Sequence, residues 1–237
     1  MEYNEFYKIM NEKCNKINIK MTDEQVKKFY KYMLLLIEWN KVMNLTAITD
    51  PDEIIQKHFI DSLTIFKYIS KDDKILDIGT GAGFPGIPIA IISSNEILLV
   101  DSLNKRINFL NEVVKELNLE NVKCKHFRAE EIGNNKEYRE KYDVITSRAV
   151  ASMNVLLEYM LPLCKLDGHC ICMKGSNIDE INECDDALKI LGGKIEDIIT
   201  LNLPDSLEKR NIVLVKKKKN TPKRYPRKAG MPSKNPL

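Results

Sequence analysis

The residues whose chemistry is easiest to interpret form one glycine-rich segment, residues 77–86, with the sequence DIGTGAGFPG. The segment begins within a short apolar run, residues 74–79, which predicts a buried strand. Glycines after such a strand let the backbone approach a ligand closely and adopt a positive φ. In open α/β sheets, ligands bind at the carboxyl ends of the strands. The segment therefore predicts a cofactor site at the end of a first strand.

Two cofactors are compatible with this turn. Gly81, Gly83 and Gly86 match the dinucleotide pattern GxGxxG, so the pattern alone does not separate NAD from S-adenosylmethionine. Asp77 favours S-adenosylmethionine, because a carboxylate there can help to place the methionine ammonium group, and a pyrophosphate gains nothing from it. Pro85 has no N–H to offer a pyrophosphate at the helix start. We expect S-adenosylmethionine, with an NAD-linked oxidoreductase as the alternative.

A second acidic residue supports an adenosyl ligand. Asp101 ends the second predicted strand, 22 residues after Gly79. A carboxylate at this position can accept hydrogen bonds from both ribose hydroxyls, but NAD enzymes share the feature. The cofactor-binding residues predicted from the turn and this strand are Asp77, Gly79, Gly81, Gly83 and Asp101.

The elements that must position this site alternate along the chain. Residues 1–70 have a helical pattern, with a capping box at Thr22 and Gln25 and a second helix that starts at Asp50-Pro51 and continues to Tyr68. Beyond residue 71, strands are predicted at 74–79, 96–101, 122–127, 142–146, 169–173, 194–201 and 211–215, and helices at 86–93, 105–117, 154–163 and 177–191. This order predicts an α/β fold with a doubly wound, mostly parallel sheet. We expect an N-terminal helical extension (1–70), a Rossmann-like domain (71–215) and a basic tail (216–237).

Composition excludes several classes of protein. The six cysteines contain no CxxC pair and the three histidines are widely separated, which indicates reduced cysteines and no metal site. No run of 18 apolar residues exists, and the first residues lack the pattern of a secretory signal. We therefore expect a cytoplasmic protein. The sequence has no coiled-coil seam, which favours a monomer.

The C-terminal residues carry most of the positive charge. Residues 216–237 contain nine Lys or Arg and no Asp or Glu, while the rest of the chain has 28 basic and 34 acidic residues. Four prolines in this stretch predict an extended tail without helix or strand. A basic tail on an acidic body suggests a polyanionic partner, the alternative being a solvated terminus.

Six motifs in fixed order carry a family resemblance from about residue 34 to the last residue. They are Trp39-Asn40 with Asn44-Leu45-Thr46, HFIDSL at 58–63, the glycine-rich segment at 77–86, Arg128-Ala129-Glu130, SRAV at 147–150 and KRYPRKAG at 223–230. The chain resembles the RsmG (GidB) family of bacterial methyltransferases, which methylate N7 of one guanine in the 530 loop of 16S ribosomal RNA. HFIDSL and KRYPRKAG make the resemblance specific, because the glycine turn occurs in many methyltransferases.

The resemblance implies a class I S-adenosylmethionine-dependent enzyme that acts on 16S rRNA or the small ribosomal subunit. It implies cofactor contacts at Gly79, Phe84, Ala129, Glu130 and Arg148. We expect RNA contacts from the tail, with Tyr225 stacking on an unpaired base. The RNA-binding residues predicted in the tail are Lys223, Arg224, Tyr225, Arg227 and Lys228.

Guanine N7 carries an in-plane lone pair and no hydrogen, so the reaction needs no general base. Arg148 ends the fourth predicted strand, and we expect it to position the cofactor and the RNA, the alternative being a structural ion pair. His58 and Asp61 lie three residues apart, on one helical face, and His58 is expected to be packed rather than catalytic. None of the cysteines has the setting that pyrimidine C5 methylation requires. An RNA-binding assembly factor without turnover remains a further alternative.

Overall fold

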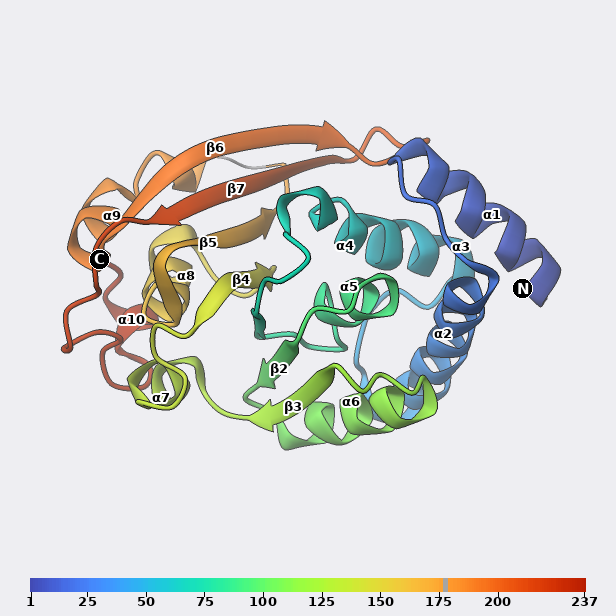
Figure 1. Cartoon of the computed structure of the whole chain (residues 1–237), viewed down its shortest axis with the longest axis horizontal. Coiled ribbons are helices and arrows are strands. Elements are labelled where there is room, and N and C mark those ends of the chain that lie inside the picture. Colours follow the sequence, from blue (N-terminus) through green and yellow to red (C-terminus); the bar gives the residue numbers. More distant parts are fainter. Residues whose placement is uncertain (177–178) are drawn as a thin grey trace.

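The computed structural model describes residues 1–176 and 179–237, and within them seven strands form one sheet (Figure 1). Their order across the sheet is β3-β2-β1-β4-β5-β7-β6. The strands are β1 (Ile75–Ile78), β2 (Ile97–Asp101), β3 (Val122–His126), β4 (Tyr142–Arg148), β5 (Cys164–Lys174), β6 (Gly193–Asn202) and β7 (Lys209–Lys217). The first five strands pair in parallel, and β7 pairs antiparallel with both β5 and β6. The predicted doubly wound, mostly parallel sheet is confirmed.

The strand order reverses between β1 and β4. From β1 the chain moves to β2 and then β3 on one side, and β4 returns to pair with the other side of β1. In such sheets the crevice at the carboxyl ends of the two central strands is where ligands bind. Both the glycine-rich segment after β1 and Arg148 at the end of β4 lie at this position.

Helices cover both faces of the sheet (Figure 1). One face carries α1 (Tyr3–Lys16), α2 (Asp23–Met43), α3 (Pro51–Ile54), α4 (Asp61–Leu63), α5 (Gly86–Ile92) and α6 (Asn104–Glu116). The other carries α7 (Ala129–Asn134), α8 (Met153–Met160), α9 (Asp185–Leu191) and α10 (Met231–Lys234). Alternation along the strands assigns Leu99 to the first core and Leu98 and Val100 to the second.

The N-terminal helices start as predicted, but the second of them is interrupted. Thr22 and Gln25 form the capping box of α2, and Asp50 accepts a hydrogen bond from the Glu53 N–H at the start of α3. The predicted continuous helix to Tyr68 instead consists of α3, a π-helical turn (Ile55–Ile60), α4 and a 3-10 turn (Phe66–Tyr68). The π turn buries four of its six residues, and such turns are frequent at functional sites.

The prediction of an extended C-terminal tail is wrong. β7 continues to Lys217, which moves the boundary beyond residue 215, and Met231–Lys234 form α10. Polar contacts hold the intervening residues: the Arg139 guanidinium donates hydrogen bonds to the carbonyls of Thr221, Pro222 and Tyr225. The proline spacing does exclude long helices, but side chains of the folded domain satisfy the irregular backbone. We call residues 221–237 the C-terminal segment.

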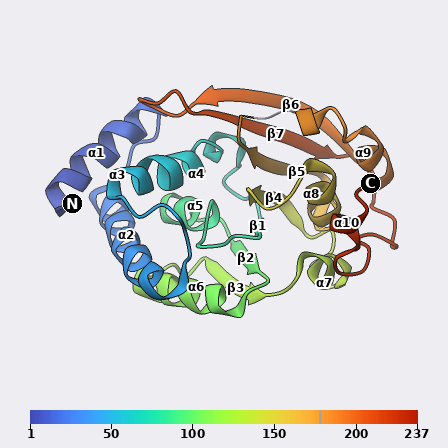
Figure 2. The same cartoon turned by 180° about the vertical axis from the view of Figure 1, so that it is seen from behind.

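The two ends of the chain lie on opposite sides of the molecule (Figure 2). The N-terminal helices pack beside α5 and α6, whereas the C-terminal segment lies beside α7 and α8. The predicted helix 177–191 begins outside the described residues, and its described part forms a 3-10 turn (Asp179–Ile181) and α9. None of the helices in the described part of the chain has the length and apolarity that a membrane span needs.

Candidate active site

Two buried carboxylates shape the glycine-rich turn after β1. Asp77 is fully buried, and its Oδ2 accepts hydrogen bonds from Thr80 Oγ1 (2.6 Å) and the Gly86 N–H (2.9 Å). Oδ2 of Asp101, at the end of β2, accepts one from the Gly81 N–H (2.9 Å). Carboxylates of β1 and β2 therefore both hold the backbone of the turn in place.

Burial changes the acidity of Asp77. Complete desolvation raises the pKa of its carboxyl to about 6, while the hydrogen bonds from Thr80 and Gly86 act in the opposite direction. The carboxylate is therefore mostly ionised at neutral pH. The sequence suggested that Asp77 helps to place a ligand's ammonium group; the structure places it beneath the turn, where it organises the backbone.

The backbone of the turn requires glycine. Gly81 and Gly83 have φ angles of +63° and +103°, in the region that side chains disfavour. No atom lies within 4 Å of the position that a Cβ of Gly81 would take, so the space beside this residue is open. At Gly79 the side chain of Val150 fills that position instead, which brings the ends of β1 and β4 into contact.

A cavity of about 290 Å³ lies at the carboxyl ends of β1 and β2, and we call it the glycine-turn cavity. It is lined by residues from three strand ends, α7, α8 and the C-terminal segment: Ile78, Gly79, Asp101, Ser102, Phe127, Arg128, Ala129, Glu130, Val150, Tyr159, Gly230 and Ser233. Two carboxylates, Asp101 and Glu130, give it polar groups that can accept hydrogen bonds from hydroxyls or amines.

The C-terminal segment forms one wall of the glycine-turn cavity. The Gly230 N–H donates a hydrogen bond to Glu130 Oε1 (2.9 Å), and the Tyr159 hydroxyl lies 3.3 Å from Ser233 Oγ. Further along, Arg227 donates to the fully buried Glu158 through its backbone N–H (2.7 Å) and its guanidinium (2.6 Å from Nη2). The position of this wall therefore depends on a few specific polar contacts.

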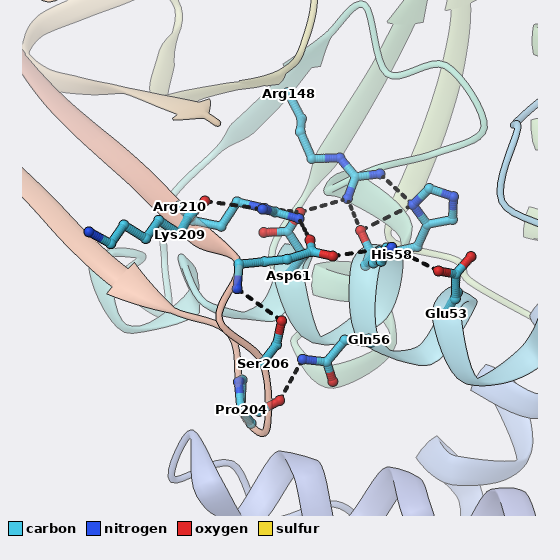
Figure 3. Close-up of polar contacts among 11 residues, drawn as sticks. Glu53, Gln56, His58, Asp61, Arg148, Pro204, Ser206, Lys209 and Arg210 are labelled. Atoms are coloured by element: carbon cyan, nitrogen blue, oxygen red, sulfur yellow. Dashed lines mark hydrogen bonds and ion pairs between the residues drawn. The ribbon is translucent and has the colours of Figure 1, made fainter. Parts of the chain in front are cut away.

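Arg148 is the centre of a second polar cluster, which joins β4 to the π turn and α4 (Figure 3). Its Nη1 donates hydrogen bonds to the Lys57 carbonyl (2.9 Å) and to Asp61 Oδ2 (3.2 Å). The Arg210 Nε also contacts Asp61 Oδ2, at 3.3 Å. The Arg148 guanidinium carbon lies 4.8 Å from the centre of the Phe84 ring. The expected position of Arg148 at the sheet edge is confirmed, and the ion pair that was its alternative role is present as well.

His58 is neutral in this cluster. Burial and the nearby Arg148 charge lower its pKa to about 3. A guanidinium only donates hydrogen bonds, so Arg148 Nη2, 3.0 Å away, requires His58 Nδ1 to be unprotonated. The proton is then on Nε2, which donates to Thr46 Oγ1 at 2.8 Å. With its ring stacked 4.4 Å from that of Phe84, His58 is packed and hydrogen-bonded.

A second cavity, of about 320 Å³, lies on the other side of the β4 end, and we call it the Asp61 cavity. Its lining comes from the N-terminal helical layer and from the ends of β4, β5 and β7: Ile48, Lys57, His58, Asp61, Thr64, Arg148, Ala149, Met173, Lys174, Gly175, Arg210, Asn211 and Ile212. Arg148 and Ala149 line this cavity, and the next residue, Val150, lines the glycine-turn cavity. The residues 148–150 therefore separate the two cavities.

Four of the predicted cofactor residues line the glycine-turn cavity together: Gly79, Asp101, Ala129 and Glu130. The other five predicted cofactor residues do not line it. Asp77, Gly81 and Gly83 form the turn, whereas the Phe84 ring packs against Tyr32 and His58, and Arg148 faces the Asp61 cavity. Sequence reasoning missed Val150, Tyr159, Gly230 and Ser233, although Gly230 ends the KRYPRKAG motif.

The predicted RNA-binding residues divide into two groups. Lys223, Arg224 and Lys228 are exposed on the C-terminal segment. Tyr225 is only 7% exposed, and the guanidinium of Arg227 is engaged by Glu158. The prediction that Tyr225 offers an exposed stacking surface is therefore wrong in this structure, because the ring packs into the core beside α7 and α8.

Comparisons with known proteins agree with this geometry. The family model GidB, described as rRNA small subunit methyltransferase G, matches residues 25–213. The protein named ribosomal RNA small subunit methyltransferase G of Clostridium tetani is 50% identical, over 98% of this chain and 99% of its own length. The protein of that name from Acetivibrio thermocellus is 52% identical, over 97% of this chain and 96% of its own.

Solved structures support the fold alone. An S-adenosylmethionine-dependent methyltransferase from Aquifex aeolicus has a TM-score of 0.55 and 16% identity, over 73% of this chain and 96% of that one. The TYW2 protein of M. jannaschii, solved with AdoMet, has a TM-score of 0.52 and 17% identity, over 66% of this chain and 74% of its own. The family match overturns the NAD-linked alternative. With its glycine-rich turn, paired cavities and near full-length relatives, the chain belongs to the GidB family, described as rRNA small subunit methyltransferase G.

Proposed function

We propose that this chain transfers the methyl group of S-adenosylmethionine to N7 of a guanine in the 530 loop of 16S ribosomal RNA. The observation that carries the proposal is the pair of cavities separated by residues 148–150, in a member of an rRNA methyltransferase family. A methyl donor in one cavity and a base in the other can meet at the end of β4, at the switch point of the sheet.

The glycine-turn cavity fits the donor. The Gly81 N–H donates a hydrogen bond to Asp101, which lines this cavity, and a Cβ at Gly81 would project into free space, so a ligand can approach the turn there. Asp101 and Glu130 would hold the ribose hydroxyls and an amino group, and Gly79 and Ala129 would border the adenosyl part. When bound, S-adenosylmethionine supplies an electrophilic methyl group on a sulfonium sulfur.

The protein's contribution to the transfer is positioning. N7 of guanine attacks through its lone pair and releases no proton, so no side chain has to act as a base. In agreement with this, His58 is neutral and packed, and Asp61 is engaged by two arginines. Arg148, held by Lys57, His58 and Asp61, fixes the end of β4 between the two cavities. Holding the reactants in line can contribute about 7–11 kcal/mol to lowering the barrier.

The exposed basic side chains of the C-terminal segment are the proposed RNA contacts. Lys223, Arg224 and Lys228 lie on the segment that also forms a wall of the glycine-turn cavity, so RNA bound there would lie beside the donor. The substrate is 16S rRNA or the small ribosomal subunit, and we place the protein in the cytoplasm, where that subunit is assembled. We propose that it acts as a monomer, since the sequence has no coiled-coil seam.

The test is to map N7-methylguanine in 16S rRNA from cells with and without the gene, by chemical cleavage at the modified base. We expect one site in the 530 loop to lose its modification when the gene is deleted. The wild-type gene should restore the modification, and a gene encoding Arg148→Ala should not. If methylation of the rRNA is unchanged by the deletion, and the purified protein binds RNA without transferring methyl groups, the protein is an assembly factor rather than an enzyme.

A further inference from the structure

We propose that the Asp61 cavity is the guanine pocket, and that the Asp61 carboxylate accepts hydrogen bonds from N1–H and the 2-amino group of the target base. The inference rests on the proposed function, because it assumes that a guanine of the RNA is the acceptor. It assigns the residue that distinguishes guanine from the other bases, a role that is separate from holding the methyl donor.

The position of the cavity suits the acceptor. Ala149 lines the Asp61 cavity, and the next residue, Val150, lines the glycine-turn cavity, so the two cavities are adjacent. The volume of about 320 Å³ is in the range of small-molecule pockets. Its apolar side chains, Ile48, Met173 and Ile212, can pack against the faces of a planar base. Enzymes that modify a base in a nucleic acid bind it in a pocket of this kind after it has left its stack.

The carboxylate of Asp61 has one oxygen available for a ligand. Oδ2 is shared by Arg148 (3.2 Å) and Arg210 (3.3 Å) (Figure 3). Oδ1 is buried, and among the described residues it has no hydrogen-bond partner. Asp61 as a whole is only 4% exposed. A buried acceptor without a donor is unfavourable, and a ligand that brings donors removes this penalty.

Guanine is the RNA base that offers what this oxygen lacks. Its Watson–Crick edge carries two adjacent donors, N1–H and the 2-amino group, whereas adenine, cytosine and uracil each present an acceptor beside their donor. N7 lies on the opposite side of the purine. A guanine that turns its donors to Asp61 therefore directs N7 away from α4, towards the end of β4, where the methyl group has to arrive.

The experiment is a two-by-two comparison of enzyme and substrate. Small subunits are reconstituted from 16S rRNA that carries either guanosine or inosine at the methylated position; inosine lacks only the 2-amino group. The kcat/KM for methyl transfer is measured for the wild type and for Asp61→Asn. Glu208→Gln is the matched control, because Glu208 also pairs with Arg210 (2.8 Å) but does not line the cavity.

For the wild type and Glu208→Gln, we expect kcat/KM to be about tenfold to a hundredfold higher with guanosine than with inosine. This ratio corresponds to the loss of one hydrogen bond to a charged group. Asp61→Asn should methylate guanosine more slowly and show almost no preference, while binding S-adenosylhomocysteine as the wild type does. A preference retained in Asp61→Asn overturns the inference. So does a wild type that methylates inosine as well as guanosine, a result that needs no variant. Failure of the wild type to methylate the guanosine subunit contradicts the proposed function instead.

Discussion

The two cavities beside residues 148–150 are closed by opposite ends of the chain, and by different kinds of contact. The N-terminal side of the Asp61 cavity is formed by polar side chains of the π turn and α4, and these elements are anchored in the main apolar core through Phe59, Ile60 and Leu63. The wall of the glycine-turn cavity includes the C-terminal segment, which is held by polar contacts. Arg227 forms an ion pair with Glu158, Arg139 donates hydrogen bonds to backbone carbonyls of the segment, and the Gly230 N–H donates to Glu130. A wall whose helices are anchored in the apolar core tolerates the loss of one contact better than a wall held by a few polar contacts, so the two cavities should respond differently to substitution.

The largest effect is expected from Arg227→Ala. The variant leaves Glu158, which is fully buried, without its charged partner, and such a loss costs about 3–5 kcal/mol of unfolding free energy. Because the same segment lines the glycine-turn cavity, we also expect weaker binding of S-adenosylhomocysteine. Denaturant unfolding and calorimetric titration measure the two quantities. Lys228→Ala, at the exposed next position, should change stability by no more than about 0.5 kcal/mol. A stable Arg227→Ala that binds the ligand normally would mean that this wall does not depend on the ion pair.

Arg148→Ala tests the boundary between the cavities. We expect methyl transfer to fall by about a hundredfold, because the end of β4 would no longer be fixed between donor and acceptor. The loss of stability should be smaller, about 1–3 kcal/mol, since Asp61 keeps its contact with Arg210. Arg210→Ala is the comparison, as it removes the other arginine of Asp61. Equal losses of activity in the two variants would show that Arg148 acts only through the ion pair.

The pH dependence of Asp77→Asn probes the glycine turn. Burial raises the pKa of Asp77 in the folded protein to about 6, above its unfolded value, so the folded state binds more protons between pH 4 and 6. Its contribution to stability is therefore present at pH 4 and is lost as the pH rises through 6. Asn does not titrate, so from pH 4 to 7.5 the variant should gain roughly 2–3 kcal/mol relative to the wild type. Parallel stability curves, measured by urea unfolding at each pH, would contradict the raised pKa.

The smallest effect is expected from the paired change Lys223→Gln and Lys228→Gln. Both side chains are exposed, so stability and S-adenosylhomocysteine binding should stay as in the wild type. The slope of log affinity for the ribosomal substrate against log salt should become less steep by about 1.4 to 1.8, the value for two phosphate contacts. Filter binding over a range of salt concentrations measures it. An unchanged slope would place the RNA contacts elsewhere.

The C-terminal segment also changes one expectation that rested on sequence. For a basic tail in solvent, deletion of residues 220–237 should weaken binding of the ribosomal substrate more than binding of the methyl donor. Because Gly230 and Ser233 line the glycine-turn cavity, the same deletion should weaken donor binding as well. Charge and proline content predicted an extended tail, and neither property reveals that Arg139, Glu130 and Glu158 of the folded domain bind this segment.

The alternation of strands and helices, the cofactor turn and the family could be predicted from the sequence alone. These follow from local properties: apolar period, glycine spacing, capping residues and motifs read within a few positions. Which distant residues share a cavity became evident only from the folded chain. Asp61 and Arg148 are 87 residues apart, and Glu130 and Gly230 are 100 apart, yet each pair is in hydrogen-bond contact. Such pairings depend on the packing of whole layers against the sheet, which no short stretch of sequence encodes.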